Sequence, residues 1–154
     1  MIFSFAPSPA LAPFVERYVV YAFPAAMRNG APAALTVFPD TSSFACFIYG
    51  DPLQATHKSH QTHNTRSGIC GFQTYRVDMQ GAGNMGGVSV RFTPWGASNF
   101  VPEDVGVLVD VRVAFRDRYR AGEIESVQAE MSGLPDAQAR ARRVEVPAGT
   151  SVFD

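Results

Sequence analysis

Residues 87–94 read Gly-Val-Ser-Val-Arg-Phe-Thr-Pro, and this segment indicates a β-strand with one buried face. Val88, Val90 and Phe92 alternate with other residues, so they lie on the same side of an extended chain. Pro94 follows directly, and proline ends strands because it lacks the amide hydrogen that strand pairing requires. The segment therefore predicts a half-buried strand that ends at Phe92.

A second alternating run precedes this strand, from Gln73 to Gln80. Tyr75, Val77 and Met79 face one side and polar residues lie between them, which predicts a strand with one solvent-exposed face. Residues 81–87 are rich in glycine and predict a hairpin connection in which the glycines supply positive φ angles.

Shorter apolar runs lie closer to the N-terminus. Residues 18–23 and 35–38 are rich in aromatic and β-branched side chains, which favour strands. The run Phe44–Tyr49 is apolar at every position, which predicts a central strand covered on both faces. About six or seven such strands predict a mainly β fold, either an antiparallel β-barrel or a cupin-like sandwich.

The pattern becomes helical towards the C-terminus. Ile124, Val127 and Met131 recur at helical spacing, which predicts a helix over residues 123–134. Residues 136–146 predict a second helix, because they are acidic at the start and rich in arginine later, the charge order that the helix dipole favours.

The length of 154 residues is typical of one domain. We expect a single α+β domain with a β-rich body over about residues 1–94 and a short helical tail over about residues 95–147. No internal repeat or low-complexity linker divides the sequence.

Charge and composition exclude several classes of protein. The 13 Lys and Arg residues are balanced by 14 Asp and Glu, so a nucleic-acid binder is not expected, since phosphate contacts need clustered positive charge. No apolar run approaches the roughly 18 residues of a membrane span. Cys46 and Cys70 lie in apolar runs, which predicts buried, reduced thiols and a cytoplasmic protein without a membrane partner.

No motif points strongly to an enzyme, and we expect neither catalytic residues nor a cofactor. Gly81, Gly83 and Gly86 have the spacing of a dinucleotide fingerprint, but a strand follows them where that motif needs a helix. The chain contains no Gly-x-Ser-x-Gly nucleophile elbow.

His57, His60 and His63 form the alternative candidate, a metal site in a small cupin-like enzyme. Neither a helix nor a strand would direct all three imidazoles to one side at this spacing. The neighbouring residues are polar, so we expect residues 53–66 to be a solvated, mobile loop that binds no metal.

Asp40 and Arg91 are the charged residues of greatest interest. An arginine in an apolar strand either extends to water or pairs with a carboxylate. One interpretation is a structural ion pair or a Pro-Asp turn. The other is a ligand carboxylate or phosphate held by Arg91 at the mouth of an apolar pocket. The candidate ligand-binding set is Phe38, Asp40, Phe44, Cys46, Tyr75, Arg91, Phe92 and Trp95.

Several short motifs, in order, resemble the N-terminal domain of AraC-type transcription regulators. The resemblance covers about residues 3–145, and no single motif carries it. The similar segments are Leu11–Tyr18, Phe38-Pro39-Asp40, Gly50-Asp51-Pro52, Gly71 and Gly87–Pro94.

The resemblance implies a barrel-like or cupin-like domain that senses a small effector and forms a homodimer through its C-terminal helices, about residues 123–146. Such regulators continue into helix-turn-helix units, and nothing of that kind follows Val146. We therefore expect that the chain is either an excised domain or a protein that has lost its DNA-binding module. We also expect that it does not bind DNA directly. A further alternative is an interaction protein that pairs with full-length relatives.

Overall fold

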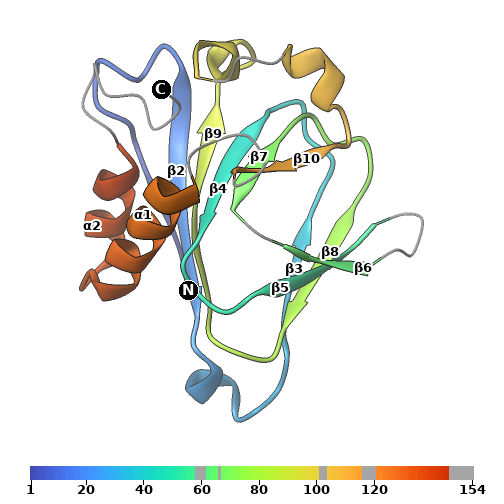
Figure 1. Cartoon of the computed structure of the whole chain (residues 1–154), viewed down its shortest axis with the longest axis vertical. Helices are drawn as coiled ribbons and strands as arrows, with labels where there is room; N and C mark the ends of the chain where they lie inside the picture. Colours follow the sequence, from blue (N-terminus) through green and yellow to red (C-terminus); the bar gives the residue numbers. More distant parts are fainter. Residues whose placement is uncertain (58–61, 66, 101–103, 116–120, 146–154) are drawn as a thin grey trace.

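The computed structural model describes residues 1–57, 62–65, 67–100, 104–115 and 121–145, which form two antiparallel sheets and two helices (Figure 1). The six-stranded sheet has the order β1 (Ile2–Phe5), β2 (Val15–Phe23), β9 (Met85–Phe92), β4 (Phe44–Ile48), β7 (Gly68–Cys70) and β10 (Arg112–Ala114). The four-stranded sheet has the order β3 (Ala33–Val37), β8 (Val77–Gly81), β5 (Leu53–Thr56) and β6 (Thr62–Thr65). The helices are α1 (Ala121–Gly133) and α2 (Ala137–Val144), and short 3-10 turns occupy Ala25–Arg28, Gly96–Asn99 and Val105–Leu108.

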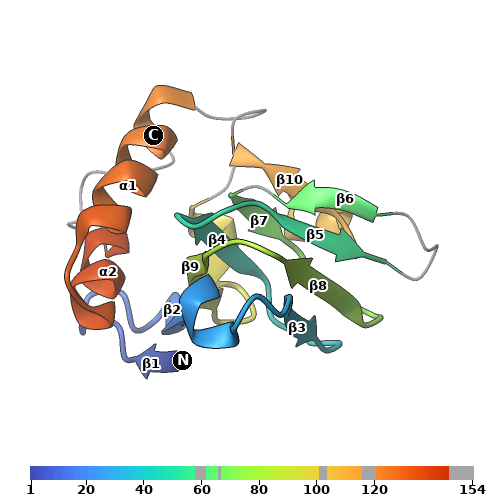
Figure 2. The same ribbon diagram turned by 90° about the horizontal axis from the view of Figure 1, so that it is seen from below.

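The fold is a sandwich and not a closed barrel, because the strands of the described residues pair within two separate sheets. The helices cover one face of the six-stranded sheet, and the four-stranded sheet lies on the opposite side (Figures 1 and 2). The expected mainly β architecture with a helical C-terminal segment is therefore confirmed, in its sandwich form.

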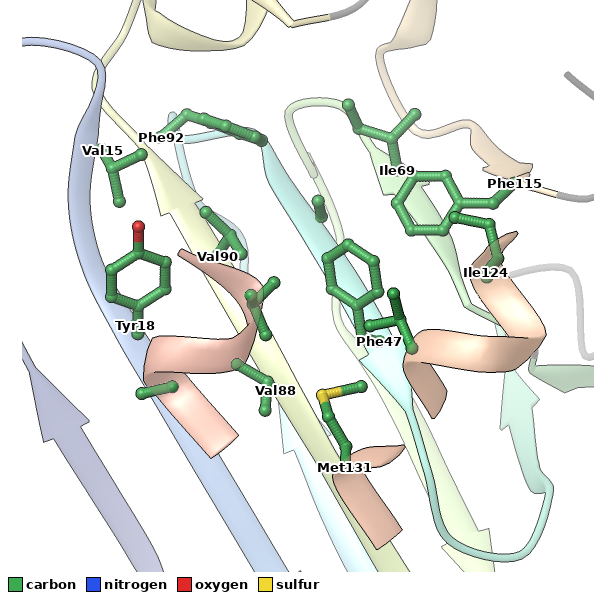
Figure 3. Close-up of a cluster of buried hydrophobic side chains, with 14 of the residues drawn as sticks. Val15, Tyr18, Phe47, Ile69, Val88, Val90, Phe92, Phe115, Ile124 and Met131 are labelled. Atoms are coloured by element: carbon green, nitrogen blue, oxygen red, sulfur yellow. The ribbon is translucent and has the colours of Figure 1, made fainter. Parts of the chain in front are cut away.

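The main hydrophobic core lies between the six-stranded sheet and the helices (Figure 3). Phe47 and Val88 from the sheet meet Met131 from α1, and each of the three side chains is almost fully buried. Truncating a buried phenylalanine in such a core costs about 3–5 kcal/mol. This layer fixes the helices against the sheet.

Alternation along β9 sorts its residues between the two faces of the sheet, as predicted. Val88, Val90 and Phe92 join the core on the helix side. Ser89 and Arg91 point to the other side, towards the four-stranded sheet. Strand β4 is likewise covered on both faces, with Ala45 and Phe47 towards the helices and Cys46 and Ile48 away from them.

The helices also agree with the sequence. The predicted stripe Ile124, Val127 and Met131 is buried against the sheet. Asp136 caps α2, since its carboxylate accepts a hydrogen bond of 2.7 Å from the backbone amide of Ala139. Helix α2 ends at Val144, slightly earlier than predicted.

The prediction of a solvated loop over residues 53–66 is wrong, because β5 and β6 form a hairpin there. Leu53 and Ala55 are buried in the core of the four-stranded sheet, while Gln54 between them is exposed. Gln54 therefore lies on the outer face of a sheet and not in a loop. Residues 58–61 lie outside the described residues.

Two further predictions in the central segment are wrong. The strand β8 begins at Val77, so Tyr75 precedes it, and Gln73 instead forms an isolated bridge with Asp40. Residues 81–87 are not a hairpin connection, because β8 and β9 belong to different sheets.

The glycines of this segment serve close packing and not backbone conformation. Among the described glycines, positive φ occurs at Gly30. A Cβ atom on Gly86 would collide with the ring of Tyr49, and one on Gly87 would collide with the hydroxyl of Tyr21. Glycine is needed at both positions because two tyrosine side chains cross the strand.

Candidate functional site

A cavity of about 200 Å³ lies between the two sheets, on the side of the six-stranded sheet that faces away from the helices. Most of its wall is apolar. Leu35, Val37 and Met79 contribute from the four-stranded sheet, and Phe44 and Ile48 contribute from β4. The cavity reaches the surface at Phe38, whose side chain lines it and is 68% exposed.

The register of the six-stranded sheet places four residues in one row across the cavity face. Arg91 is opposite Phe44, Phe44 is opposite Cys70, and Cys70 is opposite Arg112. Paired residues of neighbouring strands point to the same side of a sheet. An arginine therefore stands at each end of a row whose middle is apolar.

Arg91 is the arginine at the mouth of the cavity. Its Nη2 donates to Asp40 Oδ1 at 3.0 Å and its Nε donates to Glu16 Oε2 at 2.7 Å. Burial lowers the pKa of Arg91, but the hydrogen bonds to Glu16 and Asp40 outweigh it and leave that pKa raised. The structural ion pair is therefore present, and two carboxylates neutralise the charge of Arg91.

Arg112 is the second arginine, and sequence reasoning missed it. It is partly buried on β10, and its Nη1 lies 3.5 Å from Cys70 Sγ. Burial lowers the pKa of Arg112, while Cys70, Cys46 and Tyr21, when ionised, raise it, and the net result is a raised pKa. Arg112 thus carries a full positive charge at neutral pH within the wall of the cavity.

The sequence around Arg112 does show the alternation of a strand, but the arginine and not the neighbouring valines points inward. Residues 109–113 read Val-Asp-Val-Arg-Val, an alternation typical of a strand. Ordinarily the valines of such a run face the core. Here Val109 and Val111 are exposed and Arg112 points inward, because β10 pairs with β7 at the edge of the sheet.

The two cysteines are free thiols beside Arg112, as predicted buried and reduced. Cys46 Sγ lies 3.5 Å from the hydroxyl oxygen of Tyr21. Burial raises the pKa of Cys70 to about 11, although Arg112 lowers it. Burial, followed by Cys46, raises the pKa of Tyr21 well above its usual value. Cys70 and Tyr21 are therefore neutral at pH 7.

A second cavity adjoins the first and shares Met79 and Arg112 with it. Its volume of about 20 Å³ offers space for roughly one water molecule. His57 Nδ1 lies 3.2 Å from the Tyr75 hydroxyl oxygen on its wall. The side-chain oxygen of Gln73 is also on this side, buried and without a hydrogen-bond partner among the described residues.

The structure gathers part of the predicted ligand-binding set around the main cavity. Its wall includes Phe38, Asp40, Phe44, Cys46 and Arg91. Three predicted residues lie elsewhere, and their assignment to an apolar pocket with the others is wrong. Tyr75 faces the second cavity, Phe92 is buried towards the helices and stacks on Phe100, and Trp95 is 69% exposed on the surface.

The alternative prediction, a metal site formed by three histidines, is only partly covered by the described residues. His60 lies outside the described residues, and His63 is placed by its backbone pairing with Ala55. Within the described ranges, no group of three or more metal-ligating side chains comes together. The metal-dependent enzyme stays a prediction.

Comparison with known proteins finds a matching family model. The family model of a domain of unknown function (DUF6597) matches residues 3–114. This segment includes most of β1, all later strands up to β10, and Arg112, whereas α1 and α2 lie beyond it. No curated protein and no solved structure matches the chain. In the part of the chain that the structure describes, no helix is long and apolar enough to cross a membrane.

Proposed function

The chain belongs to the family of the domain of unknown function DUF6597, and we propose that this member binds a small molecule in the cavity between its two sheets. The observation that carries the proposal is the cavity itself, which is apolar along most of its wall and has Arg112 among its lining residues. Apolar pockets with a few convergent polar groups are the usual form of ligand sites.

The volume limits the size of the ligand. Pockets for drug-sized molecules hold roughly 300–1,000 Å³. The cavity, at about 200 Å³, is smaller. We therefore propose a ligand of about ten non-hydrogen atoms, well below drug size.

We further propose that binding is sensed by the helices, as the resemblance to AraC-type regulators implies. Ile48 lines the cavity with its side chain, and its carbonyl oxygen accepts a hydrogen bond from Gln128 of α1. Gln128 also donates to Ser67 Oγ at 2.7 Å. A ligand that displaces Ile48 would thereby favour one of two positions of α1.

Homodimerisation through residues 123–146 stays a prediction. The apolar residues of α1, Ile124, Val127 and Met131, pack against the chain's own sheet. A dimer would therefore use the outward, polar faces of the helices, where Glu130 pairs with Arg143. A cytoplasmic location is also proposed, since both cysteines are free thiols.

Thermal unfolding of the full chain with a broad set of small acids, alcohols, amides, sugars and aromatics tests the proposal. A true ligand at 100-fold over its Kd adds about 2.7 kcal/mol to the free energy of unfolding. Ser89→Phe, which fills the cavity, should abolish the shift, and Ser132→Phe on the exposed face of α1 should keep it. If no compound shifts the transition, or if Ser89→Phe keeps the shift, the proposal is wrong.

A further inference from the structure

We propose that the hydroxyl of Ser89 forms the specific hydrogen bond to the ligand, and that the ligand is a small uncharged molecule with an apolar body and one oxygen atom placed to make this bond. Alcohols, phenols and ketones make up this class. The inference rests on the proposed function, since it names a specificity-determining residue and a ligand class for the same cavity. Four features of the described residues support it.

The first feature is the position of Ser89 in the floor of the cavity. Strand β9 lies between β2 and β4 in the six-stranded sheet (Figure 1). Ser89 is opposite Val19 of β2 and opposite Cys46 of β4, and all three residues line the cavity. Its neighbours Val88 and Val90 face the helix-side core. Ser89 is partly exposed, and its exposed surface therefore faces the cavity.

The second feature is the hydrogen-bonding capacity of this hydroxyl. Among the described residues, Ser89 Oγ has no hydrogen-bond partner. The Tyr21 hydroxyl oxygen, by contrast, lies 3.5 Å from Cys46 Sγ. A serine hydroxyl donates one hydrogen bond and accepts others, so an alcohol, a phenol or a ketone can bind it. A ligand that covers Ser89 without a hydrogen bond would leave a buried hydroxyl unsatisfied, which opposes binding.

Ser42 is the second serine of the cavity wall, and its surroundings differ from those of Ser89. It precedes β4, and its backbone amide donates to Asp40 Oδ1. A ligand oxygen at Ser42 would therefore lie beside the ion pair of Asp40 and Arg91. A ligand oxygen at Ser89 would lie in the middle of the sheet, next to the apolar side chain of Val19.

The third feature is the pairing of the charged groups in the wall. Arg91 is neutralised by Asp40 and Glu16 at the mouth. Arg112 also lines the small second cavity, and Asp110 lines the same space. Each arginine of the wall therefore shares its surroundings with a carboxylate of the chain. A charged ligand would lose its hydration on entry, which is costly, so an uncharged ligand is favoured.

The fourth feature is the apolar remainder of the wall. Leu35, Val37 and Met79 contribute from one sheet, and Phe44 and Ile48 contribute from the other. These side chains offer contact to a ring or a short hydrocarbon chain and no partners for the several hydroxyls of a sugar. The ligand is therefore a mainly apolar molecule in which a single oxygen reaches the floor of the cavity.

Isothermal titration of the full chain with two pairs of probes tests the inference, because the members of a pair share shape and differ in one oxygen atom. The pairs are p-cresol with p-xylene, and acetophenone with α-methylstyrene. Ser89→Ala should weaken the binding of at least one oxygen-containing probe by about 5-fold to 10-fold, the loss expected for one hydrogen bond. The same variant should not weaken the binding of the hydrocarbon partner. Comparing the two chains cancels the difference in hydration between the probes.

Ser4→Ala is the matched control. Ser4 lies on β1 in the same row of the sheet, opposite Val19, but it is exposed and outside the cavity wall. Ser4→Ala should therefore bind all four probes as the wild-type chain does. Should Ser89→Ala fail to fold, Ser89→Cys gives the same comparison, because a thiol is a weak hydrogen-bonding group. In the wild-type chain, acetophenone should bind more tightly than benzoate, which is similar in shape and charged.

The outcomes separate this inference from the proposed function. The inference is wrong if Ser89→Ala weakens both members of each pair equally or weakens neither, or if Ser42→Ala alone causes the selective loss. It is also wrong if benzoate binds more tightly than acetophenone, or if both oxygen-containing probes fail to bind while other compounds bind. In each of these cases the cavity remains a binding site for a different ligand. If no compound of any class binds to the wild-type chain, both proposals are wrong.

Discussion

Arg91 and Asp40 meet at the mouth of the cavity, with Arg91 Nη2 3.0 Å from Asp40 Oδ1. The two residues lie on segments 51 positions apart in sequence, so the pair ties the end of β3 to β9. Ser42 adds to the arrangement, since its backbone amide donates to the same carboxylate oxygen at 3.1 Å. The pair therefore joins two distant segments of the chain at the wall of the cavity.

The first prediction concerns the strength of this pair. Asp40→Asn should lower the free energy of unfolding by about 1 kcal/mol, because the pair is partly buried and linked to a third group. Arg17→Gln, which breaks the more exposed pair with Glu16, should cost less than about 0.5 kcal/mol. Urea denaturation compares the two variants. Equal costs would contradict a special role for Asp40.

The second prediction separates Phe92 from Trp95. Phe92→Ala should destabilise the chain by about 3–5 kcal/mol, because Phe92 is buried in the helix-side core. Trp95→Ala should change stability by less than about 0.5 kcal/mol and leave ligand affinity unchanged, because Trp95 is exposed and lies outside the cavity wall. A large loss of ligand affinity in Trp95→Ala would contradict the site.

The third prediction tests the close packing at glycine. Gly86→Ala should cost about 1–3 kcal/mol, because its Cβ would press on the ring of Tyr49. Gly122→Ala in α1 meets open space and should stabilise the chain by about 0.5–1 kcal/mol through helix propensity. Thermal unfolding measures both changes. A stabilising Gly86→Ala would show that Tyr49 does not cross the strand as described.

The fourth prediction concerns Cys70 and pH. Its pKa rises from 9.0 to about 11 on folding, because burial disfavours the thiolate. The unfolded chain therefore releases the thiol proton at a lower pH than the folded chain does. The contribution of Cys70 to stability is complete below pH 9.0 and declines as the pH rises towards about 11.

Unfolding measured from pH 8 to 11 should show this decline, and Cys70→Ala should make it shallower. The thiol should also react slowly with alkylating reagents at neutral pH in the folded chain. Rapid modification of Cys70 at neutral pH without unfolding would contradict its burial. An unchanged pH profile in Cys70→Ala would contradict the raised pKa.

The fifth prediction tests the connection between the cavity and α1. Gln128→Leu removes the hydrogen bonds to the Ile48 carbonyl oxygen and to Ser67 Oγ, so it should destabilise the chain by about 1–3 kcal/mol. In the wild-type chain, a bound ligand should alter hydrogen exchange in α1, and in Gln128→Leu that response should be weaker. An identical response in both chains would contradict the proposed route.

Local pattern was sufficient for much of the fold. Alternation of apolar residues in β9, and apolar residues on both faces of β4, correctly predicted these two strands, because side chains alternate along any extended chain. The stripe Ile124, Val127 and Met131 gave a correct helix for the same reason at helical period. Pairing partners are not local, so the hairpin at residues 81–87 was wrong and the sandwich was one of two alternatives.

The candidate site was only partly predictable. Adjacent residues on a strand face opposite sides, so Arg91 and Phe92 cannot line one cavity together, and the alternation itself carried this signal. Arg112 was harder to find. Its inward direction depends on the pairing of β10 with β7, which no pattern near residue 112 reveals. The position of Arg112 at the cavity is thus determined by strand pairing and not by the local sequence.

Methyl-resolved NMR of the full chain, titrated with a compound that raises its unfolding temperature, tests most directly whether the space between the sheets is a binding site. The proposed function predicts saturable shifts of the Leu35, Val37 and Met79 methyl signals, with smaller shifts at Met131 on the far side of the sheet. Shifts that fail to saturate, or that are as large at Met131 as at Met79, would contradict binding in this cavity.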